Sequence, residues 1–131
     1  MQLKEYTQFH SRYNLIRRLG SGGFSEVWLA EDTKADNLQV ALKVYASAGG
    51  LDEEGVQMFS HEFSLLFDKS HSNLLKPTHF DDFDKRPYLV MPFCEQGSAQ
   101  KLVGNITEAA AWKLLSDVAS GLAYLHSRTP V

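Results

Sequence analysis

The chain has 131 residues, of which 44% are apolar and 22% are charged, and its formal net charge is −3 at pH 7. This length and composition are typical of one globular domain with its own core, and the small negative charge gives no reason to expect nucleic acid or an anionic membrane as a partner. Cys94 is the single cysteine, so an internal disulfide is excluded and a reducing compartment is favoured. Because the N-terminus lacks a signal-peptide core and no run approaches the roughly 20 apolar residues of a membrane span, the sequence predicts a cytoplasmic protein.

The first third of the chain predicts strands around a glycine-rich tip. Residues 1–12 are polar with scattered aromatic side chains and predict a loose lead-in. Three glycines, Gly20, Gly22 and Gly23, predict a hairpin tip whose backbone N–H groups can approach a phosphate without an intervening Cβ. The strands expected in this part lie at 13–19, 25–31 and 38–45.

The residues after the glycines decide between kinds of phosphate loop. A dinucleotide-binding loop needs a helix there, and a Walker loop needs Lys-Ser or Lys-Thr. Residues 26–30 predict a strand instead, with Val27 and Leu29 on one face, so a dinucleotide-dependent oxidoreductase is disfavoured. On the 38–45 strand, Ala41 and Lys43 share a face, so a small residue and an ammonium group could contact one ligand; an ordinary surface lysine is the alternative.

Residues 51–67 predict an amphipathic helix, with Asp52 as a candidate N-cap. Its broad apolar arc contains Val56, Met58, Phe59, Phe63, Leu65 and Leu66. Glu62 falls inside this arc, where an unpaired carboxylate is costly to desolvate. Lys43 is the nearest expected cation, so the sequence predicts an ion pair between Lys43 and Glu62.

The rest of the chain predicts two more strands and then helices. The strands lie at 77–83 and 87–91, and a short polar turn or helix follows at 98–104. A long helix is expected from Thr107, as N-cap, to about His126. Its apolar stripe consists of Ala111, Leu114, Leu115, Val118, Leu122 and Leu125.

These motifs, in this order, resemble the first half of a protein kinase. Residues 20–27, Gly-Ser-Gly-Gly-Phe-Ser-Glu-Val, resemble the glycine-rich loop G-x-G-x-x-G-x-V, and Val-Ala-Leu-Lys at 40–43 resembles the V-A-I-K strand. Residues 71–75, His-Ser-Asn-Leu-Leu, are similar to the H-P-N-I-V segment that follows the kinase helix. Ser25 stands where the third glycine is usual, and its small side chain is compatible with nucleotide binding. The sequence of the loop at residues 22–25 resembles serine/threonine kinases more than tyrosine kinases.

The resemblance implies an α+β fold, a kinase-like N-lobe with a five-stranded antiparallel sheet and one main helix, followed by the first helices of a C-lobe. The implied divisions are a lead-in at 1–12, an ATP-binding N-lobe at 13–91, a hinge at 92–97 and a truncated C-lobe at 98–131. The ATP-contacting residues that it implies are Leu19, Gly20, Ser21, Gly22, Gly23, Phe24, Ser25, Val27, Ala41, Lys43, Met91, Pro92, Phe93 and Cys94. Lys43 would hold the α- and β-phosphates, Glu62 would orient Lys43, and Met91 would close the back of the adenine pocket. Cys94 is expected to be a small hinge residue, not a reactive thiol.

By the same resemblance, a longer parent would transfer the γ-phosphate of ATP to hydroxyl groups of a protein substrate. The sequence contains no H-R-D loop, magnesium-binding asparagine or D-F-G aspartate before Val131. We therefore expect no Mg²⁺ ligands in this chain and no phosphoryl transfer by it, although the parent would use Mg²⁺. The uncovered stripe on 107–126 predicts a homodimer or helix exchange. The alternative is a kinase-like pseudoenzyme or regulatory module that binds nucleotide or a protein.

Overall fold

The computed structural model describes residues 2–128, apart from the side chain of Leu66, and these residues form two compact units. The first unit contains residues 2–68 and 76–93. The second contains residues 69–75 and 94–128. Among the described residues, no helix is long and apolar enough to cross a membrane. Residues 129–131, at the end of the expected C-lobe segment, lie outside the described part of the chain.

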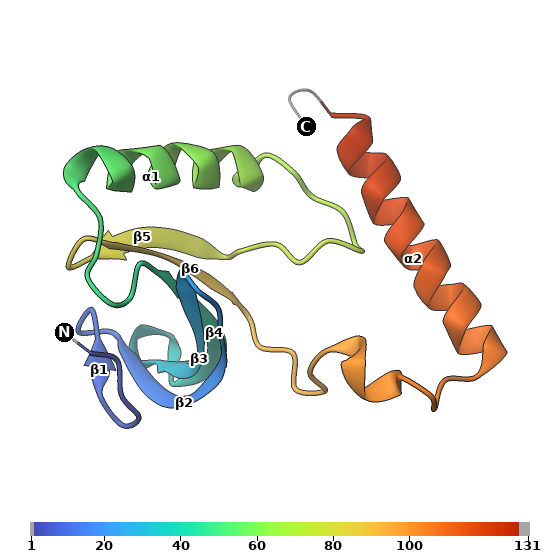
Figure 1. The fold of residues 1–131 in the computed structure, drawn as a ribbon, viewed down its shortest axis with the longest axis horizontal. Helices are drawn as coiled ribbons and strands as arrows, with labels where there is room; N and C mark the ends of the chain where they lie inside the picture. Colours follow the sequence, from blue (N-terminus) through green and yellow to red (C-terminus); the bar gives the residue numbers. More distant parts are fainter. Residues whose placement is uncertain (1, 129–131) are drawn as a thin grey trace. The chain divides into compact units, whose positions relative to one another are not determined.

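The first unit is built on one antiparallel sheet of six strands in the order β1-β2-β3-β4-β6-β5 (Figure 1). The strands are β1 (Gln8–Phe9), β2 (Tyr13–Ser21), β3 (Ser25–Asp32), β4 (Leu38–Tyr45), β5 (His79–Phe83) and β6 (Arg86–Pro92). The predicted antiparallel sheet with one main helix is confirmed. The predicted number of five strands is wrong, because Gln8 and Phe9 pair with Asn14 and Tyr13 of β2.

The period-two alternation decides which face of the sheet holds the core. Trp28 lies opposite Leu42 in the register of β3 and β4, and Ala30 lies opposite Val40. Those four side chains are buried together, whereas Val27, Leu29, Ala41 and Lys43 alternate with them and lie on the other face. The core also contains Leu3, Phe9, Tyr13, Leu15, Val44, Tyr88 and Val90. The predicted faces of the 25–31 and 38–45 strands are therefore confirmed.

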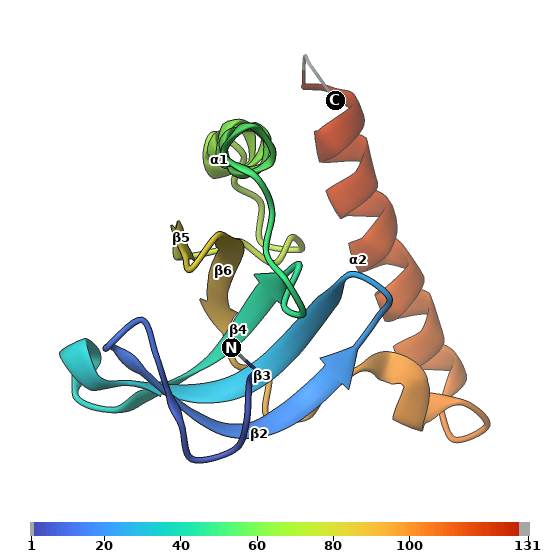
Figure 2. The ribbon, with the colours of Figure 1, turned by 60° about the vertical axis from the view of Figure 1, so that its left-hand side comes forward.

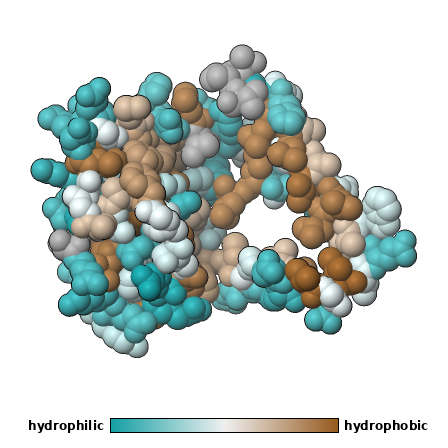
Figure 3. All heavy atoms as spheres, in the orientation of Figure 1, coloured by the Kyte–Doolittle hydropathy of each residue, from teal (hydrophilic) through white to brown (hydrophobic). Residues whose placement is uncertain are grey.

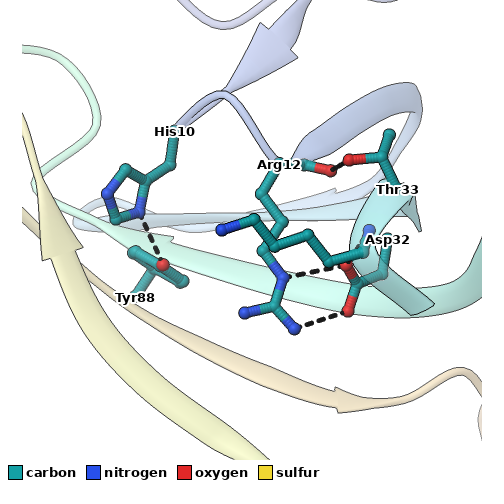
Figure 4. Close-up of polar contacts among 6 residues, drawn as sticks. His10, Arg12, Asp32, Thr33 and Tyr88 are labelled. Carbon is teal, nitrogen blue, oxygen red and sulfur yellow. Dashed lines mark hydrogen bonds and ion pairs between the residues drawn. The ribbon is translucent and has the colours of Figure 1, made fainter.

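The N-terminal residues are not the loose lead-in that the sequence predicts. They form a hairpin with β2, on the side of the sheet opposite α1 (Figures 1 and 2). Its three-residue loop, 10–12, has His10 and Ser11 at positive φ (55° and 52°), and the Arg12 N–H donates a 3.2 Å hydrogen bond to the Phe9 carbonyl. Phe9 is 0% exposed, with its ring centroid 5.1 Å from that of Phe83, and His10 Nδ1 forms a 2.8 Å hydrogen bond with the Tyr88 hydroxyl (Figure 4).

A partly buried ion pair holds this hairpin against the end of β3. Arg12 donates from Nε and Nη2 to the two carboxylate oxygens of Asp32, each at 2.8 Å (Figure 4). Asp32 also accepts a 3.0 Å hydrogen bond from the Lys34 N–H, which caps the short 3-10 turn Thr33–Ala35. The hydrogen bonds from Arg12 are the main cause that holds the pKa of Asp32 below its ordinary value. Two-point contacts of this kind fix geometry as well as energy, so they hold the turn after Phe9 in place.

Helix α1 (Glu53–Phe67) covers the other face of the sheet (Figure 2). Asp52 Oδ1 accepts a 2.8 Å hydrogen bond from the Gly55 N–H, as expected of an N-cap. Phe59, Phe63 and Phe67, spaced by four residues, form the inward stripe. Phe63 stacks edge-on against Phe80 of β5 with ring centroids 5.8 Å apart.

The broad apolar arc predicted for α1 is wrong in part. Met58 is 63% exposed, and Leu65 and Glu62 are exposed as well. The Leu66 side chain, also predicted in the arc, lies outside the described residues. Three large phenylalanine rings determine which side of the helix faces the sheet, and that orientation leaves the Glu62 carboxylate in water, where it needs no cation.

The second unit contains a short 3-10 helix, η2 (Ala99–Leu102), and the long helix α2 (Glu108–His126). Thr107 Oγ1 accepts a 3.2 Å hydrogen bond from the Ala110 N–H, so the predicted cap and the predicted end at His126 are confirmed. The 69–75 segment belongs to this unit: the Ser70 N–H donates to the Tyr124 hydroxyl at 2.9 Å. Figure 3 shows the apolar side chains along α2, and the exposed members of the predicted stripe are Leu114, Leu115, Val118 and Leu122.

Candidate functional site

The glycine-rich tip joins β2 to β3 as a tight hairpin. The Gly22 N–H donates a 2.9 Å hydrogen bond to the Ser25 carbonyl, and Gly20 lies opposite Val27 in the register of the two strands. The chain after the glycines is β3, not a helix. The strand that the sequence predicts there is therefore confirmed, and neither a dinucleotide fingerprint nor a Walker loop fits this geometry.

The fold itself does not require glycine at this tip. A Cβ built on Gly20, Gly22 or Gly23 meets no atom within 4 Å, and none of these residues has a φ in the left-handed region. Gly50 is different, because its φ is +77° and a Cβ there would lie 2.9 Å from the Lys85 Cβ. Neither backbone strain nor crowding therefore explains the three tip glycines, and a tip without side chains leaves its N–H groups open to the close approach of a ligand.

The tip faces a hollow of about 440 Å³. The hollow is lined by residues 21–26 of the tip, by Arg18, and by the 46–50 segment that follows β4. Arg18 forms a 3.1 Å ion pair with Glu26 at the base of the hairpin. Ser21, Gly22, Gly23, Phe24 and Ser25, all expected to contact nucleotide, thus line one open space, whereas Val27, Ala41 and Lys43 do not line it.

A second group of expected contacts lies side by side on the sheet. Val27 lies opposite Lys43 in the register of β3 and β4, and Ala41 lies opposite Met91 in the register of β4 and β6. These four side chains occupy the face opposite the buried core, with Ala41 buried and the others partly exposed. Leu19, on β2 just before the tip, is more exposed. The arrangement offers a flat apolar surface beside one ammonium group.

The Lys43 ammonium has an aromatic neighbour instead of a carboxylate. Its Nζ lies 5.2 Å from the ring centroid of Tyr45. Within the described part of the chain, Lys43 and Glu62 form no ion pair, and Glu62 is exposed. The predicted Lys43–Glu62 contact is therefore wrong for this conformation. The cause is the rotation of α1 that turns Phe59 and Phe63 toward the sheet, since Glu62 lies about 100° around the helix from Phe63.

The residues expected at the hinge fall on both sides of the division between the units. Met91 and Pro92 end β6, with Pro92 opposite Val40, and Phe93 is the last residue of the first unit. Cys94 belongs to the second unit and has an exposed free thiol, and its backbone carbonyl accepts a 3.0 Å hydrogen bond from the Gly97 N–H. No group of three or more His, Cys, Asp or Glu side chains among the described residues could hold a metal ion.

The sequence patterns do not identify Tyr45 as a neighbour of the Lys43 ammonium. Tyr45 lies two residues after Lys43 on the same strand face, and its ring centroid is 5.0 Å from that of Phe59. Phe59 also stacks on Phe24 of the tip, with centroids 6.0 Å apart. The spacing of Tyr45 from Lys43 is the available signal, but spacing alone does not identify a ring as the partner of an ammonium.

Residues 13–131 match the sequence family described as protein tyrosine and serine/threonine kinase. The probable serine/threonine-protein kinase PknB of Lactococcus lactis is 26% identical over 122 residues, which are 91% of this chain and 20% of that protein. Serine/threonine-protein kinase 1 of Arabidopsis thaliana is 32% identical over 124 residues, which are 89% of this chain and 14% of that protein. The chain thus spans a fifth or less of the length of these two relatives.

The same fold occurs in a solved kinase domain. The crystal structure of the Mycobacterium tuberculosis PknI kinase domain, in a form with one cysteine replaced by alanine, superposes with a TM-score of 0.75 at 23% identity. The match covers 98% of this chain and 53% of that one. The described fold is therefore the kinase fold in about half of its extent, and the chain belongs to the protein tyrosine and serine/threonine kinase family.

Proposed function

We propose that this chain is the ATP-binding part of a serine/threonine protein kinase. The observation that carries the proposal is the glycine tip, where three glycines border open space although neither strain nor crowding calls for them. Serine/threonine specificity is supported by the names of the relatives. The tip residues 20–25 would pass over the phosphates, and their N–H groups would supply donors without side chains in the way.

The remaining roles follow from position on the sheet. Leu19, Val27 and Ala41 would contact the adenine ring, and Met91 would close the back of that surface. Lys43 would hold the α- and β-phosphates through its ammonium group. Backbone groups of Pro92, Phe93 and Cys94 would bond the adenine edge. Pro92 can serve only as an acceptor there, since it has no N–H.

Phosphoryl transfer belongs, in this proposal, to a longer protein. Such transfer relies on positioning and on charge stabilisation by Mg²⁺ and its ligands. The catalytic loop, the Mg²⁺-binding asparagine and the D-F-G aspartate are not among the 131 residues. We expect the purified chain to give no transfer to a generic protein substrate in an assay with labelled ATP and Mg²⁺, and turnover at ordinary kinase rates would contradict this.

A regulatory or pseudoenzyme module is the second candidate, and one observation favours it. Glu62 is exposed and lies apart from Lys43, so the charge pair expected of an active kinase is not formed in this conformation. A lobe that only binds nucleotide or a protein partner does not need that pair. The reading frame after Val131 separates the two candidates, because H-R-D and D-F-G motifs there favour the enzyme.

Self-association is a further expected property of the isolated chain. The exposed apolar side chains of α2 offer a surface that two copies could cover together. Light scattering at high protein concentration is expected to give a mass above that of one chain. A strict monomer across the concentration range would contradict the proposal.

Gly22→Ala tests ATP binding directly. Its φ lies outside the left-handed region and its Cβ would meet no atom, so the substitution should leave stability unchanged or raise it by about 0.4–1 kcal/mol. The affinity for a fluorescent ATP analogue should nevertheless fall, because a methyl group would intrude where the phosphates approach. Titration and thermal unfolding of the same samples measure the two effects separately.

Gly49→Ala is the matched control, since a Cβ at Gly49 also meets no atom and its φ is also outside the left-handed region. Gly49 lines the same hollow from the 46–50 segment but is not among the residues expected to contact nucleotide, so it tests whether a methyl group elsewhere in the hollow lowers the affinity. Its substitution should leave the affinity unchanged. Equal affinity of the Gly22→Ala protein and the unmodified chain would remove the main support for an ATP site at the tip.

A further inference from the structure

Five aromatic rings connect the glycine tip, β4, α1 and β5 within the first unit. Phe24 of the tip stacks on Phe59 with ring centroids 6.0 Å apart, and Phe59 lies 5.7 Å from Phe63. Tyr45 lies against both, 5.0 Å from Phe59 and 5.6 Å from Phe63. Phe63 in turn contacts Phe80 at 5.8 Å. Neighbouring rings restrict one another, so the orientation of the Tyr45 ring is determined by α1 as well as by its own strand.

The same tyrosine ring lies beneath the lysine of the proposed ATP site. Lys43 and Tyr45 are two residues apart on β4, so their side chains leave the same face of the sheet. Lys43 Nζ lies 5.2 Å from the Tyr45 ring centroid, inside the roughly 6 Å range of a cation–π contact. Both side chains are partly buried, which reduces competition from water. Lys43 forms no ion pair with any of the described residues.

We propose that Tyr45 is a positioning residue for Lys43. The Tyr45 ring holds the Lys43 ammonium group over its face in the conformation where Glu62 is exposed to water. This inference rests on the proposed ATP site. A lysine side chain has four rotatable bonds and loses much entropy when it is fixed. Because the Tyr45 ring already restricts the lysine side chain, less entropy is lost when a nucleotide binds. Contact with the face of the ring leaves other N–H groups of the ammonium free to donate to a phosphate.

The positioning can be tested without nucleotide. In the 131-residue chain, the NMR signals of the Lys43 side-chain CH₂ group next to Nζ should be shifted upfield, because an aromatic ring shields groups above its face. Tyr45→Phe keeps the ring and should keep the upfield shift, whereas Tyr45→Leu should return the signals to ordinary lysine positions. Ordinary lysine positions in the unmodified chain, or an upfield shift that survives Tyr45→Leu, would overturn the proposal.

A second measurement separates positioning from simple packing. Tyr45→Leu should weaken binding of a fluorescent ATP analogue by about 2- to 5-fold, the range expected for a cation–π contact at a partly exposed site. Tyr45→Phe should restore the affinity. In a Lys43→Met background, Tyr45→Leu should have no further effect, because the cation is gone. An equal loss in both backgrounds would mean that Tyr45 only supports the fold, and would overturn the proposal.

The two experiments also separate this inference from the function on which it rests. Failure of the unmodified chain to bind the ATP analogue would contradict the proposed function, while the nucleotide-free NMR signals of Lys43 would still decide whether Tyr45 holds the ammonium. Conversely, normal ATP binding with unshifted Lys43 signals would leave the ATP site in place and remove only the role of Tyr45.

Discussion

Replacement of Lys43 by alanine is expected to weaken binding of a fluorescent ATP analogue by about 10- to 100-fold. A hydrogen bond between an ammonium group and a phosphate is charge-assisted, and its loss costs about 1.5–3 kcal/mol. The fold should remain intact, because Lys43 is partly exposed and forms no ion pair with the described residues. The melting temperature of the variant should therefore stay close to that of the unmodified chain.

Lys34→Ala is the matched control for this substitution. Lys34 belongs to the same unit and has an exposed side chain, so its replacement removes one positive charge without touching the proposed site. Its contact with Asp32 is made by the backbone N–H, which alanine retains. An equal, small loss of affinity in both variants would indicate general electrostatic attraction. The phosphates would then not contact Lys43, and the hollow beside Arg18 would be the next place to look.

The features predicted correctly from the sequence are those set by local periodicity and by caps. Alternation of apolar residues is enough to place Val40, Leu42 and Val44 in the core and Ala41 and Lys43 on the opposite face. The ends of the long helix follow from Thr107, whose side chain caps the first turn. Each of these signals depends on residues close together in the chain, so no knowledge of distant contacts is needed.

The features predicted wrongly depend on contacts between distant segments. The rotation of α1 is decided by Phe59, Phe63 and Phe80, and an apolar arc that also contains Met58 and Leu65 does not reveal which members face the sheet. The interior position predicted for Glu62 is wrong for that reason. A resemblance to an active kinase favours the same position, but it cannot determine which way the helix faces in a given conformation.

The N-terminal hairpin shows the same limit. Residues 2–12 look polar, and only two side chains, Leu3 and Phe9, enter the core. What holds them there is remote in sequence: Phe83, Tyr88 and the carboxylate of Asp32. The family match begins at Tyr13, so the sequence pattern of the family gives no information about residues 2–12.

Phe9→Ala is accordingly expected to lower the free energy of unfolding of the first unit by about 3–5 kcal/mol, the usual cost of removing a fully buried phenylalanine ring. Phe9 is 0% exposed and packs edge-on against Phe83 and Tyr88, with ring centroids 5.1 and 5.2 Å away. Removal of its ring therefore leaves a cavity beside these two side chains. Tyr6→Ala, in the same hairpin, is the control, because Tyr6 is 82% exposed and its N–H bond to the Leu15 carbonyl survives the substitution.

The two tryptophans allow the effect to be assigned to one unit. Trp28 is buried in the first unit, and Trp112 is exposed on α2 in the second. In a Trp112→Phe background, urea unfolding followed by fluorescence therefore reports on the sheet alone. A loss below about 1 kcal/mol for Phe9→Ala, no larger than that for Tyr6→Ala, would show that residues 2–12 are the loose lead-in that their polarity suggests. A loss of the expected size would make the hairpin a structural part of the unit that carries the glycine tip and Lys43, so truncation at Tyr13 would weaken the proposed ATP site by unfolding it.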